Sequence, residues 1–207
     1  MLYKDTVKPE TLVLLKKLMS LEILQSYFLI GGTALALQLG HRISYDIDLV
    51  GKIKTDYKDL TEKLAELGNM KMIYSEDQVF QCQINDIKID IVNYKTLNLL
   101  KPLVKIEDIR MSSIEDIATM KIKTIEDRGY KRDFFDLYCL LKKLSLESIL
   151  QFTEQRYPET NRLHAARCLV DFTDAEDQED PNMLDPKVSW EEVKKYIKTE
   201  IKKVTLV

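Results

Sequence analysis

Two glycines and two aspartates stand in one short segment, at a spacing that suits phosphate and metal binding. The segment LIGGTALALQLGHRISYDIDLV, residues 29–50, places Gly31 and Gly32 after an apolar run and Asp46 and Asp48 near its end. A glycine pair before a helix lets the backbone approach phosphate oxygens, and the helix N-terminus supplies free N–H groups. Carboxylates two residues apart on a strand emerge on one face, where they can share divalent metal ions. The segment therefore predicts a phosphate and metal site.

A third carboxylate lies in the later strand-like segment IKIDIV. Ile89 and Ile91 alternate with Asp90 and are expected to face the core. Asp90 would then lie on the opposite strand face, where Asp46 and Asp48 could meet it. Such carboxylates suit two Mg²⁺ ions, or Mn²⁺, which neutralise a triphosphate and activate an attacking hydroxyl. We expect Asp46 and Asp48 as metal ligands, and Asp90 as a further ligand or as a general base.

The surrounding pattern predicts the elements that must position these residues. Residues 28–30 indicate a buried strand, which the glycine pair ends. The run from Thr33 to Leu39 has strong helix propensity, and Gly40 is placed to terminate that helix. Thr33 could add a hydroxyl donor for phosphate. The segment SYDIDLV alternates polar and apolar residues, which predicts a half-buried strand that returns the aspartates to the glycines.

The rest of the chain divides into an α/β half and a helical half. One or two helices are predicted over residues 9–26 and another over 55–68, followed by strands in MKMIY, VFQCQI and IKIDIV with a tight turn at Asn85 and Asp86. After Pro102 the pattern becomes helical. A capping box at 112–116 starts a helix to about Arg128, and YKRDFFDLYCLLKKL resumes as a second helix after Gly129. Only helical signals follow.

These signals predict an α+β fold with a small mixed-sheet core and a helical C-terminal region. The core with its N-terminal helices would occupy residues 1–110. The helical region, residues 111–207, would complete the active site and the substrate cleft. A chain of 207 residues with 45% hydrophobic content is long enough and apolar enough for such a core.

Composition narrows the compartment and the partners. The apolar runs are far shorter than the roughly 20 residues of a spanning helix, and the N-terminus lacks a signal-peptide core, so the cytoplasm is expected, with no membrane partner. Cys82, Cys139 and Cys168 are odd in number and widely separated, which predicts buried thiols rather than disulfides or a zinc site. Lys and Arg total 31 against 34 for Asp and Glu, a net charge of −3, so any nucleic-acid binding must be local.

Four motifs in order resemble the nucleotidyltransferases of the DNA polymerase β superfamily and, more narrowly, the AbiEii/AbiGii toxin family. They are the glycine pair with its helix, the segment HRISYDIDL, the segment SIEDIATMK (113–121) and the segment RDFFDL (132–137). The resemblance extends from about residue 26 to residue 144. It implies a nucleotidyltransferase fold and a metal-dependent transfer of a nucleoside monophosphate (NMP) from a nucleoside triphosphate (NTP).

The resemblance also assigns roles to individual residues. Gly31, Gly32 and Thr33 would bind the triphosphate, and the aspartate pair would bind the metals. Lys121 would contact phosphates and take part in catalysis. Asp133 or Asp136 would shape the acceptor end of the site or position basic groups, unless they merely pair with Lys131, Arg132 or Lys143. Arg42 would reach the nucleotide, although a cation after the helix-ending Gly40 also has a structural explanation.

The acceptor stays open between two classes. An RNA or tRNA end needs basic groups beside the metals, and the candidates are Lys121, Lys123, Arg128, Lys131 and Arg132. This reading makes the chain the toxin of a type IV-like toxin–antitoxin pair with a genetic antitoxin partner. Alternatively, the enzyme modifies a small hydroxylated molecule such as an antibiotic. A non-catalytic nucleotide-binding regulator is a third reading, against which the intact aspartate pair argues.

Overall fold

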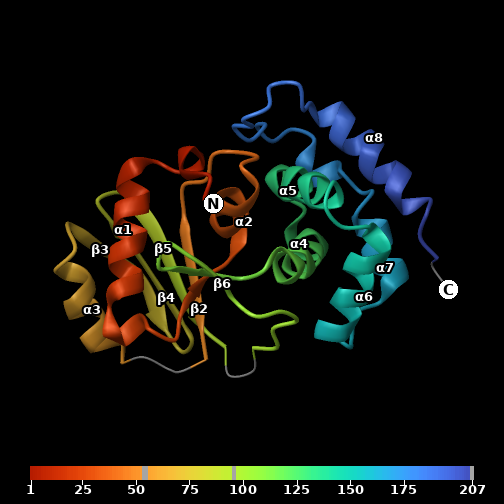
Figure 1. Cartoon of the computed structure of the whole chain (residues 1–207). Coiled ribbons are helices and arrows are strands. Elements are labelled where there is room, and N and C mark those ends of the chain that lie inside the picture. The colour runs from red at the N-terminus through yellow and green to blue at the C-terminus, as the bar shows by residue number, and fades with distance from the viewer. Residues whose placement is uncertain (53–55, 95–96, 206–207) are drawn as a thin grey trace. The chain divides into compact units, whose positions relative to one another are not determined.

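The computed structural model describes residues 1–52, 56–94 and 97–205, and these group into two compact units (Figure 1). The sheet unit comprises Met1–Gly40, Ser44–Asn98 and Pro102–Ser112. The helical unit comprises His41–Ile43, Leu99–Lys101 and Ser113–Val207. Two three-residue segments from the first half of the chain therefore belong to the helical unit.

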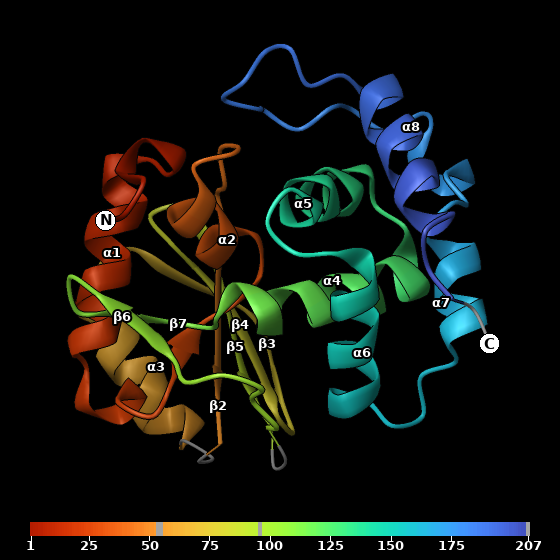
Figure 2. The same ribbon diagram turned by 45° about the vertical axis from the view of Figure 1, so that its right-hand side comes forward.

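The sheet unit is built on strands that form one mixed sheet. The strands are β1 (Phe28–Leu29), β2 (Ile47–Gly51), β3 (Met70–Glu76), β4 (Val79–Ile84), β5 (Ile87–Asn93), β6 (Val104–Ile106) and β7 (Ile109–Met111). Its helices are α1 (Pro9–Ser20), α2 (Gly31–Leu39) and α3 (Tyr57–Ala65), with short 3-10 helices at Lys4–Thr6 and Glu22–Leu24. In both views α1 and α3 lie on one face of the sheet and α2 on the other (Figures 1 and 2).

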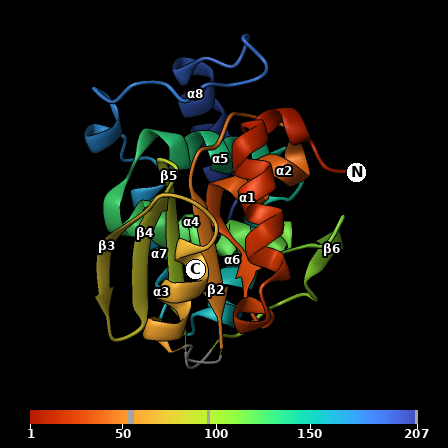
Figure 3. The same cartoon turned by 90° about the vertical axis from the view of Figure 1, so that its left-hand side faces the viewer.

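The strand order within the described residues is β3-β4-β5-β2-β1-β7-β6, and the first four strands run side by side in Figure 3. β2 pairs in parallel with β5, and β1 in parallel with β7, while the hairpins are antiparallel. Phe80 and Cys82 of β4 are fully buried on the face that α3 covers, where the ring of Tyr57 lies 5.4 Å from that of Phe80. The opposite face is therefore free for polar groups near α2.

The helical unit contains the longest helix of the described chain, α4 (Ile114–Arg128). The other helices are α5 (Lys131–Leu141), α6 (Leu146–Arg156), α7 (Arg162–Cys168) and α8 (Trp190–Ile201), with a 3-10 helix at Thr173–Ala175. α6 lies beside α4 in Figure 2. Nη1 of Arg156 in α6 forms an ion pair at 2.8 Å with Oδ1 of the fully buried Asp116 in α4. Phe134, Phe135, Phe172 and Trp190 pack as an aromatic cluster between α5 and α8.

The predicted α+β class and most elements are confirmed. Gly40 ends α2 in the left-handed conformation with φ of 67°, and Asn85 and Asp86 form the predicted tight turn with φ of 50° and 64°. Ser113 caps α4 by accepting from the Asp116 N–H, as the capping box predicts. Residue 55, at the start of the predicted helix over 55–68, lies outside the described residues.

Three predictions are corrected by the structure. The chain after Pro102 is not yet helical, because β6 and β7 form a hairpin that extends the sheet beyond β1. Its strands have only three residues each, too few for a periodicity signal. The strand predicted over 44–50 begins only at Ile47, which leaves Asp46 in the preceding loop. Of the cysteines only Cys82 is buried; Cys139 and Cys168 are half-buried, and all three are free thiols.

Every helix in the described part of the chain is too short or too polar to cross a lipid bilayer.

Candidate active site

The glycine turn and Asp48 lie against each other in the sheet unit. Gly31 has φ of +70°, a conformation that side-chain-bearing residues rarely adopt. A Cβ atom at Gly31 would lie 2.7 Å from Oδ2 of Asp48. The N–H of Ile30 donates to the backbone carbonyl of Asp48 at 2.9 Å. Glycine is therefore required here for two reasons, the backbone angle and the space that the Asp48 carboxylate occupies.

Strand register places Asp48 and Asp90 next to each other. β2 and β5 pair in parallel with Asp48 opposite Asp90. Asp90 also pairs with Gln81 of β4, whereas its neighbour Ile89 pairs with the buried Cys82. Because partners across a sheet share a face, the two aspartates lie on the face opposite α3. This is the arrangement that the alternation of residues 89–91 predicts.

A lysine that the sequence analysis did not single out joins these aspartates. Lys88 Nζ donates to Asp90 Oδ2 at 2.9 Å. The hydrogen bond to Asp90 raises the pKa of Lys88 despite partial burial, and the negative charges of Asp46 and Asp48 raise it further. Lys88 stands two residues before Asp90 on the same strand, so its side chain had to emerge on the same face. That spacing was a signal available in the sequence.

The aspartates of the sheet unit carry the features of a cation site in part. The second oxygen of Asp90, Oδ1, is buried and has no hydrogen-bond partner among the described residues. A buried carboxylate oxygen without a partner is costly unless a cation or donor satisfies it. In the part of the chain that the structure describes, no three Asp, Glu, His or Cys side chains gather closely enough to hold a metal. The carboxylate oxygens are hard ligands of the kind that Mg²⁺ or Mn²⁺ prefers, whereas the Lys88 ammonium is no ligand and would compete with the metal for Asp90.

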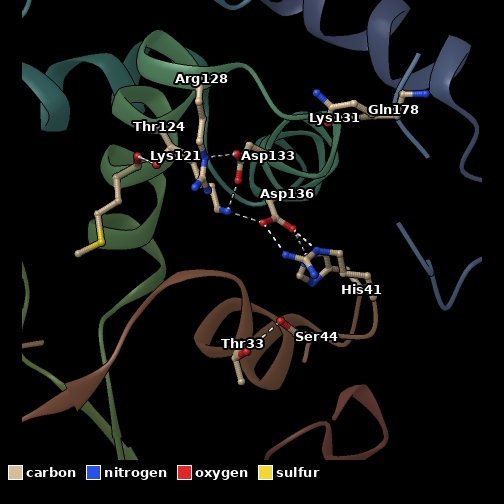
Figure 4. Close-up of polar contacts among 12 residues, drawn as sticks. Thr33, His41, Ser44, Lys121, Thr124, Arg128, Lys131, Asp133, Asp136 and Gln178 are labelled. Atoms are coloured by element: carbon tan, nitrogen blue, oxygen red, sulfur yellow. Dashed lines mark hydrogen bonds and ion pairs between the residues drawn. The ribbon is translucent and has the colours of Figure 1, made fainter. Parts of the chain in front are cut away.

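The structure places Thr33 away from a direct phosphate role. Its side chain is fully buried; its Oγ1 shares a 2.8 Å hydrogen bond with Ser44 and donates to the backbone carbonyl of Asp46. These bonds fasten the loop before β2 to α2, so Thr33 positions Asp46 (Figure 4 shows the Thr33–Ser44 pair). Gly32 lies in the first turn of α2, and no side chain of the described residues caps this helix.

The helical unit holds a second group of the predicted residues in a buried charge network, shown in Figure 4. Lys121 Nζ lies 2.7 Å from Asp133 Oδ1 and 2.6 Å from Asp136 Oδ2. Both aspartates are fully buried, and Arg128 Nε donates to Asp133 Oδ2 at 3.3 Å. Of the predicted roles for Asp133 and Asp136, the structure supports the positioning of basic groups. The alternative pairing with Lys131, Arg132 or Lys143 is not observed in the described structure. The two aspartate side chains face Lys121 and Arg128 of α4 instead.

Arg42 and His41 complete this charge network. Arg42 binds Asp136 through Nε at 2.6 Å and Nη2 at 2.9 Å, and His41 Nε2 lies 2.8 Å from Asp136 Oδ1. Burial alone would raise the pKa of Asp136, but Lys121 and Arg42 hold it well below its usual value. Burial would lower the pKa of Arg42, but the charge of Asp136 raises it. Asp136 and Arg42 therefore stay ionised in the interior, while Nδ1 of His41 is buried without a hydrogen-bond partner among the described residues.

A late segment of the chain holds Arg42 and His41 in the helical unit. Arg42 forms an antiparallel bridge with Met183. The Ile43 N–H donates to the Asn182 carbonyl at 2.8 Å, and the Leu184 N–H donates to the His41 carbonyl at 2.9 Å. Residues beyond 145 matched no predicted role, and this bridge gives residues 182–184 a defined one. Pairing between segments so distant in sequence leaves no local signal.

The predicted acceptor-binding cations fall into two groups. Lys121 and Lys131 are buried, and Lys131 Nζ is held by the Glu176 carbonyl at 3.1 Å and by Asp180 at 3.2 Å. Lys123 pairs with Glu126. Arg128 has a side chain that is 44% exposed, and Arg132 is exposed as well. The two arginines are therefore the most exposed of these five cations.

Comparison with known proteins identifies the class. A family model described as nucleotidyl transferase AbiEii toxin, type IV TA system, matches residues 13–203. The uncharacterized protein aq_aa25 of Aquifex aeolicus (strain VF5) is 30% identical over 204 residues, which cover 95% of this chain and 96% of the relative. The chain belongs to the AbiEii family of nucleotidyltransferase toxins, and it is an enzyme of the nucleotidyltransferase class.

Solved structures share the fold. MenT4, a nucleotidyltransferase toxin of Mycobacterium tuberculosis H37Rv, superposes with a TM-score of 0.53 at 14% identity, over 96% of this chain and 87% of that one. ANT(2")-Ia in complex with adenylyl-2"-tobramycin gives a TM-score of 0.54 at 15% identity, over 72% of this chain and 97% of that one. Nucleotidyltransferases generally use divalent metals, which agrees in kind with the carboxylates on β2 and β5.

Proposed function

We propose that this enzyme transfers NMP from an NTP to an RNA acceptor such as a tRNA end, as the toxin of a toxin–antitoxin pair in the cytoplasm. The observation that carries the proposal is the placement of Asp48 beside both Gly31 and Asp90. This placement unites a helix N-terminus suited to phosphate with carboxylates suited to metal. The unpartnered Oδ1 of Asp90 supports a ligand on this face.

Asp46, Asp48 and Asp90 would hold the divalent metal, Mg²⁺ or Mn²⁺, expected as two ions. When bound, the metal neutralises the triphosphate and lowers the pKa of the attacking hydroxyl. In the transfer the acceptor oxygen forms a bond to the α-phosphorus, and the bond from the α-phosphorus to the bridging oxygen breaks to release pyrophosphate. The hydroxyl proton would pass to a carboxylate base, for which Asp90 is the candidate.

The other predicted residues would bind and orient. The N–H groups at Gly31 and Gly32 would receive phosphate oxygens at the uncapped start of α2. Thr33 would act indirectly, by holding the Asp46 loop. From the helical unit we propose Lys121 as the phosphate contact and Arg42 as the residue that reaches the nucleotide, with Asp133 and Asp136 fixing their positions.

A small hydroxylated acceptor is the second candidate. The observation that favours it is the likeness to ANT(2")-Ia, whose structure contains an adenylylated aminoglycoside, together with the net charge of −3. The likeness to the toxin MenT4 covers more of this chain, 96% against 72%, and supports the toxin role ahead of antibiotic modification.

The acceptor is tested by supplying each labelled NTP with Mg²⁺ or Mn²⁺, first with total tRNA and then with a panel of small hydroxylated compounds. We expect label on RNA, and its loss in Asp48→Asn, which removes one negative charge at nearly constant volume. Asp86→Asn, at a side chain that is 90% exposed, is the matched control and should label normally. Label only on small molecules would reject the RNA acceptor, and equal labelling by Asp48→Asn would reject the metal assignment.

The toxin role is tested by growth. Expression in a bacterial host without the antitoxin gene should slow growth, and Asp48→Asn should relieve the effect at equal protein level. Asp86→Asn should remain as toxic as wild type. Equal growth with wild type and Asp48→Asn would reject the toxin role and leave the transfer reaction standing.

A further inference from the structure

An exposed tyrosine lies close to two guanidinium groups at the turn that joins α4 to α5. The Arg128 guanidinium carbon lies 4.6 Å from the Tyr130 ring centroid, and that of Arg132 lies 5.6 Å from it. Tyr130 is 41% exposed, so the ring contacts both cations while one part of it stays open to solvent. Both distances are within the roughly 6 Å over which a cation is attracted to an aromatic ring.

A later segment of the chain, residues 178–180, holds the turn in place through Lys131. Gly129 ends α4 in the left-handed conformation with φ of 53°, and Tyr130 is the N-cap of α5. The Lys131 N–H donates to Gln178 Oε1 at 3.0 Å, and the Lys131 side chain is buried against Asp180 and the Trp190 ring. Lys131 therefore anchors the turn, and the residues on either side of it point outward.

The two arginines differ in how they are held. Arg128 is oriented by its Nε bond to Asp133, the carboxylate that also binds Lys121, so this arginine is fixed to the charge network (Figure 4). The side chain of Arg132 contacts the Tyr130 ring and forms no hydrogen bond or ion pair with any residue in the described ranges 1–52, 56–94 and 97–205.

We infer that Arg128, Tyr130 and Arg132 form a binding site for a nucleotide of single-stranded RNA. The base would stack on the Tyr130 ring, and the phosphates would accept hydrogen bonds from the guanidinium groups. Planar guanidinium groups bind phosphate in a bidentate way, and aromatic rings stack on any base. Asp127 and Asp174 place negative charge near the same turn, and the two guanidinium groups lie 4.6 Å and 5.6 Å from the ring centroid. This inference rests on the proposed function, because it names the surface that receives the RNA acceptor.

The test measures binding of a short labelled single-stranded RNA to the full-length protein by fluorescence anisotropy, without NTP or metal, over a series of salt concentrations. Tyr130→Ala should weaken binding by about tenfold or more, and Tyr130→Phe should retain it, because stacking needs only the ring. Arg132→Glu should weaken binding. It should also reduce the slope of log K against log salt concentration by about one unit, the change expected for the loss of one phosphate contact. Arg132→Glu breaks no hydrogen bond in the described structure, so it tests the site even if Tyr130→Ala fails to fold.

Matched controls separate this site from general charge. Arg167→Glu on the exposed face of α7 and Tyr74→Ala, at a tyrosine that is 44% exposed, should bind RNA like wild type. Unlabelled polyuridine should displace the labelled RNA, whereas polyglutamate at the same concentration should not. Equal affinity in Tyr130→Ala, Arg132→Glu and wild type would overturn the inference, and so would displacement by polyglutamate at the same concentration, because it would show charge alone.

A transfer assay separates this inference from the proposed function. With RNA as acceptor, Tyr130→Ala should raise KM for RNA by about tenfold and leave KM for NTP unchanged. If wild type and Tyr130→Ala label RNA with the same KM for RNA, the inference is overturned and the proposed function stands. Wild type that binds RNA at this turn but labels only small molecules would overturn the function and keep the binding site.

Discussion

Aspartates lie in two charged regions of this enzyme, one on the sheet and one between helices, and the two regions balance their charge differently. On the sheet, the ammonium of Lys88 pairs with Asp90 and lies near Asp46 and Asp48, and Asp90 keeps a buried oxygen without a partner in the described structure. In the helical unit both oxygens of Asp136 are engaged, by Arg42, His41 and Lys121.

The difference indicates two kinds of task. An excess of negative charge at a partly exposed surface attracts cations and costs stability until one binds. A buried network of paired charges resists rearrangement and holds its cations in fixed positions. We therefore expect the sheet carboxylates to respond to metal and the helical network to respond to loss of any partner.

The largest effect is expected when the helical network loses its central anion. Asp136→Ala leaves the buried cations Arg42 and Lys121 short of charge compensation, and should lower the free energy of unfolding by about 3–5 kcal/mol. Urea denaturation followed by circular dichroism measures this. The control Asp108→Asn, at a side chain that is 93% exposed, should change stability by less than about 0.5 kcal/mol. A similar small change in Asp136→Ala would mean that the network contributes nothing net.

Acid should weaken the same network. The folded-state pKa of Asp136 lies well below its usual value of 3.8, so its contribution to stability is present above that value and is lost as the pH falls toward the folded pKa. Between about pH 5 and about pH 3, wild type should therefore lose more stability than Asp136→Ala, which lacks the titrating group. Urea midpoints measured across this range check the difference. Parallel curves for the two proteins would contradict it.

Gly31→Ala should break the contact between the turn and the metal carboxylates. The alanine must adopt φ near +70° and place its Cβ where Asp48 Oδ2 lies, which should cost about 1–2 kcal/mol and weaken Mn²⁺ binding by displacing the carboxylate. Thermal unfolding and calorimetric titration with Mn²⁺ measure the two effects. Gly32→Ala is the control, since Gly32 has no positive φ and alanine favours helix. Equal Mn²⁺ affinity in the two variants would refute the proximity argument.

Lys88→Met is expected to have the smallest effect on stability, and it tests whether the sheet carboxylates respond to metal. The Lys88 side chain is 42% exposed, so its loss should cost at most about 1 kcal/mol in metal-free buffer. The same loss removes a cation that competes for the carboxylates, so Mn²⁺ should bind up to about fivefold more tightly. Lys88→Arg should behave like wild type. Weaker Mn²⁺ binding in Lys88→Met would show that the lysine supports the metal rather than competes with it.

Much of the fold could be predicted from local patterns. The alternation in IKIDIV, the glycine after α2, the capping box before α4 and the tight turn at Asn85 each act over a few residues, so the sequence alone determines them. The same holds for the shared face of Asp48 and Asp90, because strand alternation fixes which side each residue takes. The short hairpin of β6 and β7 escaped because three-residue strands carry no period.

What only the tertiary structure decided is which polar groups meet. Strand pairing between β2 and β5 sets Asp90 beside Asp48, and the bridge from Arg42 to Met183 draws residues 41–43 into the helical unit. Tertiary packing also buries Lys121 and Asp136 and pairs them in the interior. Such contacts join residues tens of positions apart, and their energy depends on burial and distance, neither of which a spacing along the chain contains.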